Sequence, residues 1–118
     1  MSEAGELEIV ILGCGSSGGV PRGDGGWGDC DPCEPRNRRT RCSTAAPPGG
    51  PNGTTSVLID TSPDLRQQAL AAGIRHVDAV LYTHDHADQT HGIDDLRTFA
   101  ARARKRIPAR MDAATHAS

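Results

Sequence analysis

Two histidines separated by one residue, His84 and His86, and the nearby Asp88 are the side chains of this sequence best suited to chemistry. They follow the apolar run from Val77 to Thr83, which is short and rich in β-forming residues and therefore predicts a buried strand. Because side chains alternate along a strand, His84 and His86 would leave its end on the same face. Two imidazoles held in this way, with a carboxylate from the next turn, are typical ligands of a zinc-like ion. The pattern predicts a metal site where α/β proteins place their chemistry, and a surface histidine pair without metal is the alternative.

The stretch from Thr83 to Gly92 resembles the metal motif of the metallo-β-lactamase-fold hydrolases, His-x-His-x-Asp-His-x-x-Gly. Three further stretches resemble segments of that superfamily in the same order: an opening strand with a glycine loop, a second signature, and the start of the helix after the metal motif (Leu12–Pro21, Val57–Arg66 and Ile93–Arg97). Together they resemble the phosphoribosyl cyclic phosphate phosphodiesterase-like branch, whose relatives include the tRNA 3′-processing nucleases. The resemblance runs from Leu7 to about Ala114.

This resemblance implies an α/β fold of the metallo-β-lactamase αββα type, in which two αβ halves face each other and the metal centre lies between their sheets. Only the N-terminal half matches, so residues 1–118 are expected to form one metallo-β-lactamase-like domain that is cut short on its C-terminal side. The family's other ligands, a further His, a bridging Asp and a last His, belong to the second half.

The implied cofactor is Zn²⁺ or Mn²⁺, as one or two ions, with His84, His86 and Asp88 as ligands. Gln89 stands where the usual motif has His. A neutral amide oxygen is a poorer ligand than imidazole for zinc-like ions, so one metal position is better supported than two.

Two carboxylates, Asp60 and Asp88, are the predicted catalytic residues. Asp60 ends the predicted strand 56–60, where a polar residue often does no more than bond nearby backbone amides. In the family the matching acid lies close to the metal, which implies that Asp60 holds a ligand histidine.

Cys30 and Cys33 form a C-x-x-C pair, and Cys42 follows nine residues later. Such a pair is half of a structural zinc site, a third thiolate strengthens it, and a tetrahedral site needs a fourth ligand. Relatives in this branch can carry a Cys-rich zinc site in the same loop, completed from the second half. The alternative is three reduced thiols without metal. Cys14, on the glycine loop, is expected to be a small buried hydrophobe.

The segment from Gly13 to Gly18 matches the dinucleotide fingerprint G-x-G-x-x-G. That fingerprint binds a pyrophosphate only where the loop opens a helix. Further glycines and Pro21 follow, so no helix is expected there and the loop is predicted to line the metal cleft instead.

The formal net charge of −2 gives no general signal for nucleic-acid binding, but basic residues gather in two places. They are Arg36, Arg38, Arg39 and Arg41 in one loop, and Arg97, Arg102, Arg104, Lys105, Arg106 and Arg110 near the C-terminus. They are interpreted either as solvated surface or as contacts to a phosphate substrate. No targeting or membrane segment is visible, so a cytoplasmic location without membrane contact is expected, where cysteines stay reduced or bind metal.

Strands are predicted over residues 7–12, 56–60, 78–83 and about 107–111, and helices over residues 63–72 and about 94–104. Ser62 is the predicted N-cap of the first helix and Gly73 its end. The Pro- and Gly-rich stretch 45–55 is predicted to be a turn-forming connection.

These features together predict a metal-dependent hydrolase of phosphodiesters, such as phosphoribosyl cyclic phosphate, with a small-molecule substrate. A non-catalytic metal-binding fragment or pseudoenzyme is the first alternative, favoured by the short chain and Gln89. An RNA-processing nuclease relative is the second, favoured by the arginine clusters. An uncovered apolar sheet face is expected to promote homodimers.

Overall fold

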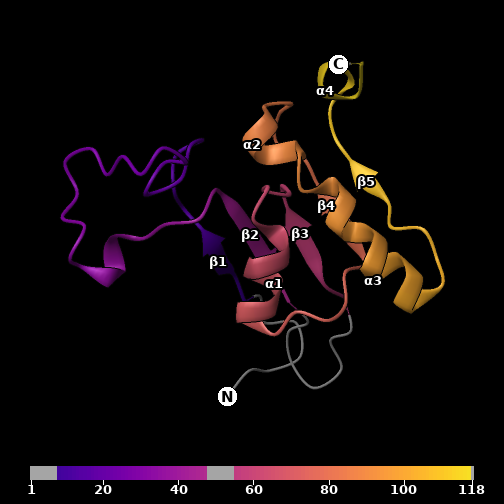
Figure 1. Cartoon of the computed structure of the whole chain (residues 1–118). Helices are drawn as coiled ribbons and strands as arrows, with labels where there is room; N and C mark the ends of the chain where they lie inside the picture. Colours follow the sequence, from indigo (N-terminus) through magenta and orange to yellow (C-terminus); the bar gives the residue numbers. More distant parts are fainter. Residues whose placement is uncertain (1–7, 48–54, 118) are drawn as a thin grey trace.

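A five-stranded mixed sheet forms the centre of the computed structural model, which describes residues 8–47 and 55–117 (Figure 1). The strands lie side by side in chain order: β1 Val10–Gly13, β2 Ser43–Ala46, β3 Val57–Ile59, β4 Ala79–Leu81 and β5 Ala109–Arg110. β2 runs antiparallel to both of its neighbours, β1 and β3, whereas β3, β4 and β5 run parallel to one another. Parallel neighbours need crossover connections, and helices supply them here.

Two eight-residue helices make those crossovers and lie on the same face of the sheet (Figure 1). Helix α1, Leu65–Ala72, connects β3 to β4, and α3, Leu96–Ala103, connects β4 to β5. Shorter elements complete the described part: η1 Pro35–Asn37, α2 Ala87–Thr90, η2 Ile93–Asp95 and α4 Ala113–Ala117. None of the helices in the described part of the chain is long and apolar enough to span a membrane.

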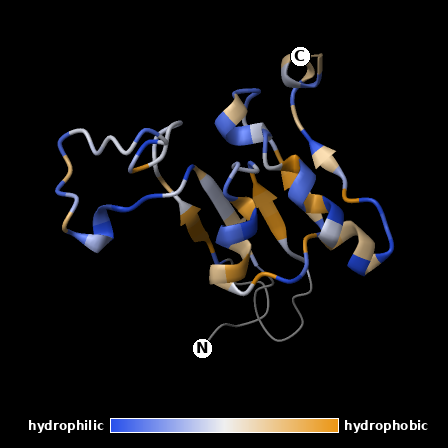
Figure 2. Ribbon diagram, viewed as in Figure 1, coloured by the Kyte–Doolittle hydropathy of each residue, from blue (hydrophilic) through white to orange (hydrophobic). Residues whose placement is uncertain are grey.

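The core lies between the helices and the sheet, and it buries Leu58 and Val80 against Leu65 and Leu96. The opposite sheet face carries a row of residues in register, in which Ile11 pairs Thr44, Thr44 pairs Ile59, and Ile59 pairs Leu81. Ile11 is 68% exposed and Leu81 is 43% exposed, so this apolar row is uncovered. Figure 2 shows the apolar strands beside the largely polar loop that joins β1 to β2.

The predicted α/β class is confirmed, and a strand or helix of the predicted type occurs in each predicted segment; each is shorter than predicted, and β1 ends one residue later, at Gly13. The sheet strand that was not predicted is β2, because residues 45–55 were predicted to be a turn-forming connection; the short helices α2 and α4 were not predicted either. Ala45 instead pairs with both β1 and β3, and Ala46 pairs with β3. Strand pairing between distant segments overrides the weak local preference of this sequence. The Pro- and Gly-rich residues 48–54 of that prediction lie outside the described residues.

Helix α1 begins two residues later than predicted, and its N-cap is Asp64 rather than Ser62. Ser62 still organises this end, because its hydroxyl oxygen accepts the Asp64 N–H at 3.0 Å and its hydroxyl donates to Gln68 Oε1 at 2.8 Å. Gly73 ends the helix in the left-handed conformation, as predicted.

The loop 14–42 between β1 and β2 extends away from the sheet (Figure 1). No helix follows the glycine segment, as predicted, and the loop's two ends are joined by backbone bonds from Gly15 N–H to Thr40 O and from Val20 N–H to Arg39 O. The buried side chain of Gln68 on α1 donates to Arg41 O at 2.6 Å and to Thr40 Oγ1 at 2.9 Å. The loop is therefore fixed at its base.

Candidate metal centre

The carboxyl ends of β3 and β4 bring the predicted site residues to one edge of the sheet. Ile59 pairs with Leu81 in the parallel ladder, and the Asp60 N–H donates to Leu81 O at 2.8 Å. The residues that follow the two strands therefore lie side by side. Helix α2 lies at the same edge (Figure 1), where the Thr61 N–H donates to Gln89 O at 2.7 Å.

Asp60 is buried and uses both carboxylate oxygens to hold one residue. The Thr83 N–H donates to Asp60 Oδ1 at 2.8 Å, and the Thr83 hydroxyl donates to Oδ2 at 2.8 Å. The Asp60 backbone has φ 61°, a left-handed conformation that Asp and Asn tolerate better than most residues. This turn aims the carboxylate at Thr83.

Thr83 in turn contacts His84, since its Oγ1 lies 2.8 Å from His84 Nδ1. An ionised carboxylate only accepts, so the single hydroxyl proton of Thr83 is directed to Asp60. Thr83 Oγ1 is then the acceptor for a proton on His84 Nδ1, and the tautomer of His84 follows from this network. The lone pair of His84 Nε2 remains available for a metal ion or a proton.

His86 lies beside His84, with 4.5 Å between ring centroids and 77° between ring planes. Its side chain is exposed, whereas His84 is half-buried. Adjacent imidazoles with one nitrogen free are chemically suited to a zinc-like ion, so this donor pair fits the implied metal. In residues 8–47 and 55–117, however, no group of three or more His, Cys, Asp or Glu side chains is arranged to hold a metal. The histidine pair is the part of the site that this chain assembles.

Asp88 and Gln89 lie on α2. The Gln89 Nε2 donates to Asp88 Oδ2 at 3.0 Å, so Gln89 turns its donor toward the carboxylate. Gln89 Oε1 is buried and is the one such side-chain atom of the described residues without a hydrogen-bond partner. Binding of a metal by Asp88 or Gln89 stays a prediction.

The cysteines occupy two different environments. Cys30 and Cys33 are exposed on loop 14–42, whereas Cys42 is half-buried at the end of this loop, directly before β2. The pKa of the Cys42 thiol is raised, first by burial and then by Asp60, Asp88 and Cys14. The Cys42 thiol is therefore under the electrostatic influence of two carboxylates of the candidate metal centre. A zinc ion shared by Cys30, Cys33 and Cys42 stays a prediction. The prediction that Cys14 is buried is wrong, because it is exposed at the edge of the glycine loop.

An ion pair between Arg41 and Asp64 borders this site and was not anticipated from the sequence. The Arg41 N–H and Nε both donate to Asp64 Oδ2 at 2.9 Å, and an Arg41 terminal nitrogen donates to Oδ1 at 2.9 Å. These bonds lower the pKa of Asp64, and the hydrogen bond to Asp64 raises the pKa of Arg41, with a smaller contribution from Asp88. Thr83 was also overlooked as a functional residue, although its place directly before His84 was a usable signal.

Comparison with known proteins agrees with this geometry. Residues 55–118 match the beta-lactamase superfamily domain. The chain belongs to this superfamily. Members of it are hydrolase-like, and the resemblance inferred from the sequence is confirmed. The match covers the part of the chain that contains Asp60, Thr83 and the histidine pair.

Two solved structures are similar to this fold. The crystal structure of a new diphosphatase from the PhnP family matches with a TM-score of 0.78 and 36% identity, over 95% of this chain and 45% of that protein. Zn²⁺-bound PqqB from Methylobacterium extorquens matches with a TM-score of 0.55 and 26% identity, over 89% of this chain and 46% of that one. One relative of this fold thus binds Zn²⁺, and the chain spans a little under half of each of these two proteins.

Curated relatives carry different names. An octanoyltransferase of Porphyromonas gingivalis is 44% identical over 92 residues, which are 78% of this chain and 18% of that protein. Coenzyme PQQ synthesis protein B of Methylobacterium nodulans is 34% identical over 104 residues, with 77% of this chain and 34% of that protein covered. The chain therefore spans about a fifth to a third of these two relatives.

Proposed function

We propose that this chain carries the first ligands of a divalent-metal-dependent hydrolase that cleaves phosphodiester bonds, such as the one in phosphoribosyl cyclic phosphate. The observation that carries the proposal is the hydrogen-bonded series from Asp60 through Thr83 to His84, beside His86. A phosphorus-centred reaction is supported by the likeness to the PhnP-family diphosphatase.

In this proposal His84 Nε2 and His86 hold Zn²⁺ or Mn²⁺, and Asp88 adds a carboxylate. A divalent ion held there acts as a Lewis acid and makes water a better nucleophile at neutral pH. Asp60 and Thr83 keep the proton of His84 on Nδ1 and fix the ring's direction. Gln89 offers a poorer ligand than His, so the proposal includes one well-held ion and at most a weaker second.

The proposed substrate is a small phosphodiester rather than a nucleic acid. Arg41 is committed to Asp64, and Arg38 lies over the Trp27 ring at 5.3 Å from its centroid. Two of the loop arginines are thus engaged within the protein, which leaves little of the cluster for a polynucleotide backbone.

A non-catalytic metal-binding role is the second candidate. The hydrogen bond from Gln89 Nε2 to Asp88 favours the non-catalytic role. Gln89 occupies the position of a ligand histidine in the family motif, and here its amide donates to the Asp88 carboxylate. Octanoyl transfer is not carried over from the Porphyromonas gingivalis relative, since the match covers 18% of that protein.

Metal content tests the histidine pair. The purified chain is expected to bind about one Zn²⁺ or Mn²⁺, and elemental analysis after gel filtration should show its loss in the His84→Ala/His86→Ala double variant. His116→Ala is the matched control, because His116 is an exposed histidine on α4. Equal metal content in the double variant and the wild type would contradict the proposal.

Turnover of bis(p-nitrophenyl) phosphate with Mn²⁺ tests the reaction class. The 118-residue chain is expected to be far less active than a complete PhnP-family diphosphatase, because electrostatic stabilisation loses most of its strength in a site open to water. A cyclic phosphate and a tRNA precursor, assayed in parallel, separate the phosphodiesterase from the nuclease. Metal binding without turnover of any of them, even in a polypeptide that supplies the second αβ half, would favour the non-catalytic role.

We propose further that the uncovered row formed by Ile11, Ile59 and Leu81 causes two copies of this chain to associate. An apolar, strand-rich surface of this kind favours association. Size-exclusion chromatography should show a dimer that Leu81→Lys converts to a monomer. A monomeric wild type would remove this part of the proposal.

A further inference from the structure

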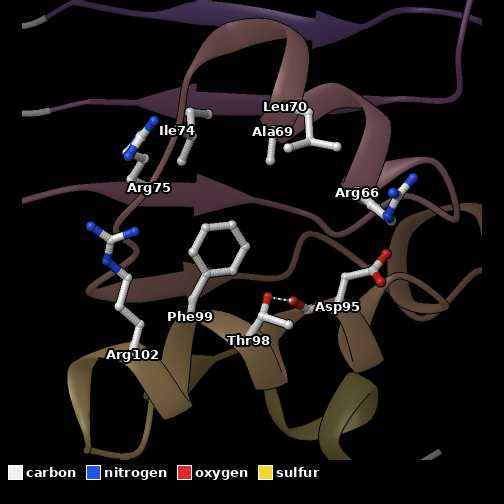
Figure 3. Close-up of a pocket in the computed structure, with 9 residues that line it drawn as sticks. All are labelled: Arg66, Ala69, Leu70, Ile74, Arg75, Asp95, Thr98, Phe99 and Arg102. Atoms are coloured by element: carbon white, nitrogen blue, oxygen red, sulfur yellow. Dashed lines mark hydrogen bonds between the residues drawn. The ribbon is translucent and has the colours of Figure 1, made fainter.

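We propose that the groove between α1 and α3 binds a small amphipathic anion, a carboxylate or phosphate carried on an acyl or aryl body. The groove is open to solvent and has a volume of about 470 Å³ on the helical side of the molecule (Figure 3). This volume falls within the range of about 300–1,000 Å³ typical of small-ligand sites. Neither Asp60 nor the histidine pair lines it, so the proposal stands independently of the phosphodiesterase.

The floor of the groove is apolar. The Phe99 ring projects from α3 into the space between the helices, opposite Ala69 and Ile74 (Figure 3). Leu70 also lines the cavity and is 68% exposed, which is a large open apolar surface for a single side chain. Covering these side chains with an acyl or aryl body would contribute about 25 cal/mol for each Å² removed from water.

One end of the groove is strongly basic. Arg75, just after α1, and Arg102, on α3, approach each other at the same end (Figure 3). Within the described residues neither guanidinium has a hydrogen bond or an acidic partner. A second cavity of about 380 Å³ shares Arg75, Phe99 and Arg102 with the first. It is also lined by His76 and Lys105. The two arginines therefore stand at the junction of two cavities, beside an aromatic ring.

The nearby acids do not neutralise this end. Asp78 accepts the Ser56 N–H at 2.7 Å and lies 2.7 Å from His76 Nε2 and 3.9 Å from Lys105 Nζ. Asp95 is at the opposite end of the groove, where it faces Arg66 (Figure 3). The charge distribution thus places an anionic head at Arg75 and Arg102 and an apolar body toward Leu70.

A small anion fits this groove better than a second protein surface. A second copy related by a twofold axis along the groove would bring arginines against arginines. A stable protein interface also needs about 800 Å² from each partner, which exceeds a groove between two eight-residue helices. Guanidinium groups, in contrast, match the planar geometry of carboxylate and the oxygens of phosphate.

Two-dimensional ¹H–¹⁵N NMR of the 118-residue chain tests the proposal, with decanoate as the probe below its micelle concentration. Decanoate should shift the amides of α1 and α3 around Ala69, Ile74 and Phe99. Decanol and decyltrimethylammonium, which have the same body without the negative charge, should bind at least about tenfold more weakly. Decyl phosphate in a parallel titration shows whether a carboxylate or a phosphate head is preferred.

Matched variants test separately the contributions of the two arginines and of the apolar floor to decanoate binding. Arg75→Gln/Arg102→Gln should weaken decanoate at least about tenfold, whereas Arg97→Gln/Arg106→Gln, which removes the same charge outside the groove, should leave binding unchanged. Leu70→Ser removes an exposed apolar contact without touching the core and should weaken all alkyl probes alike. Equal affinity for decanoate and decanol, or shifts confined to Ile11 and Leu81 on the open sheet face, would overturn the proposal.

Discussion

The turn after β3 and the loop 14–42 are both rich in polar residues, yet they behave as two different kinds of structure. Asp60, Thr61 and Ser62 are each at most 5% exposed, and each of their side chains bonds a residue at least 6 positions away, in one case 29 positions away. In the loop, Cys30 and Cys33 are exposed, and the Arg36–Glu34 ion pair joins near neighbours. The sheet fixes the directions of the side chains in the turn after β3. Spacing along the loop does not by itself bring the side chains of Cys30 and Cys33 together with distant partners.

The base of loop 14–42 resembles the turn after β3, because long-range hydrogen bonds hold it in place. Arg41 is bound to Asp64 through two nitrogens of its side chain, and Gln68 Nε2 donates to the backbone oxygen of Arg41. The two regions therefore meet at Arg41, and substitutions on either side of it can test how far the order extends.

The largest effect is expected from Gly92→Ala. A Cβ atom at Gly92 would lie 1.9 Å from the backbone oxygen of Ser62, so the turn after β3 and the segment after α2 could not keep their contact. Overpacking against backbone should cost about 3 kcal/mol or more of unfolding free energy, measured by urea denaturation followed by circular dichroism. Gly23→Ala is the matched control in loop 14–42, where no atom lies within 4 Å, and it should be neutral or slightly stabilising. Equal effects would refute the contrast between the two regions.

Asp60→Asn should weaken Zn²⁺ binding by about 10- to 100-fold while the left-handed turn persists, because Asn tolerates that conformation. The asparagine amide would donate to Thr83 Oγ1, and the Thr83 proton would then turn to His84 Nδ1. The proton of His84 would move to Nε2, where the metal is expected. ¹⁵N NMR of the imidazole nitrogens reports this tautomer directly in the metal-free protein. An unchanged tautomer with unchanged affinity would show that Asp60 only supports the backbone.

Asp64→Asn should cost about 1.5–3 kcal/mol of unfolding free energy, because it removes charge-assisted hydrogen bonds to Arg41. Both side chains are partly buried, with 19% of Asp64 and 30% of Arg41 exposed. The folded-state pKa of Asp64 is lowered, so the pair stabilises the protein fully above the unfolded pKa of about 3.9. This stability is lost as pH falls through the lower, folded-state pKa. Urea denaturation of wild type and variant from pH 7 to pH 2 should therefore show two curves that converge at the acidic end. Curves that stay parallel would exclude the linkage.

The smallest effect is expected from Arg36→Gln. The Arg36 side chain is 88% exposed and pairs with its neighbour Glu34, and such surface pairs contribute little because water screens them. The unfolding free energy should change by less than about 0.5 kcal/mol. Arg41→Gln in the same loop should resemble Asp64→Asn instead. A large effect at Arg36 would mean that the order at the base of the loop reaches its outer part.

The sequence alone determined the features that depend on local pattern. The apolar run before His84 predicted β4, the one-residue spacing predicted that His84 and His86 lie together, and Gly73 predicted the end of α1. These inferences held because strand alternation and helix termination are properties of short segments.

Tertiary structure decided what depends on distant segments. Strand β2 forms because β1 and β3 flank it, although its last two residues, Ala45 and Ala46, belong to the stretch predicted to be a turn. Thr83 connects Asp60 to His84 only because two parallel strands end side by side. Cys42 precedes β2, and the antiparallel pairing of β2 with β3 brings its thiol under the electrostatic influence of Asp60. Hydrogen bonds and electrostatic interactions depend on distance in space. The residues that take part in them are therefore set by the packing of the sheet and not by spacing along the chain.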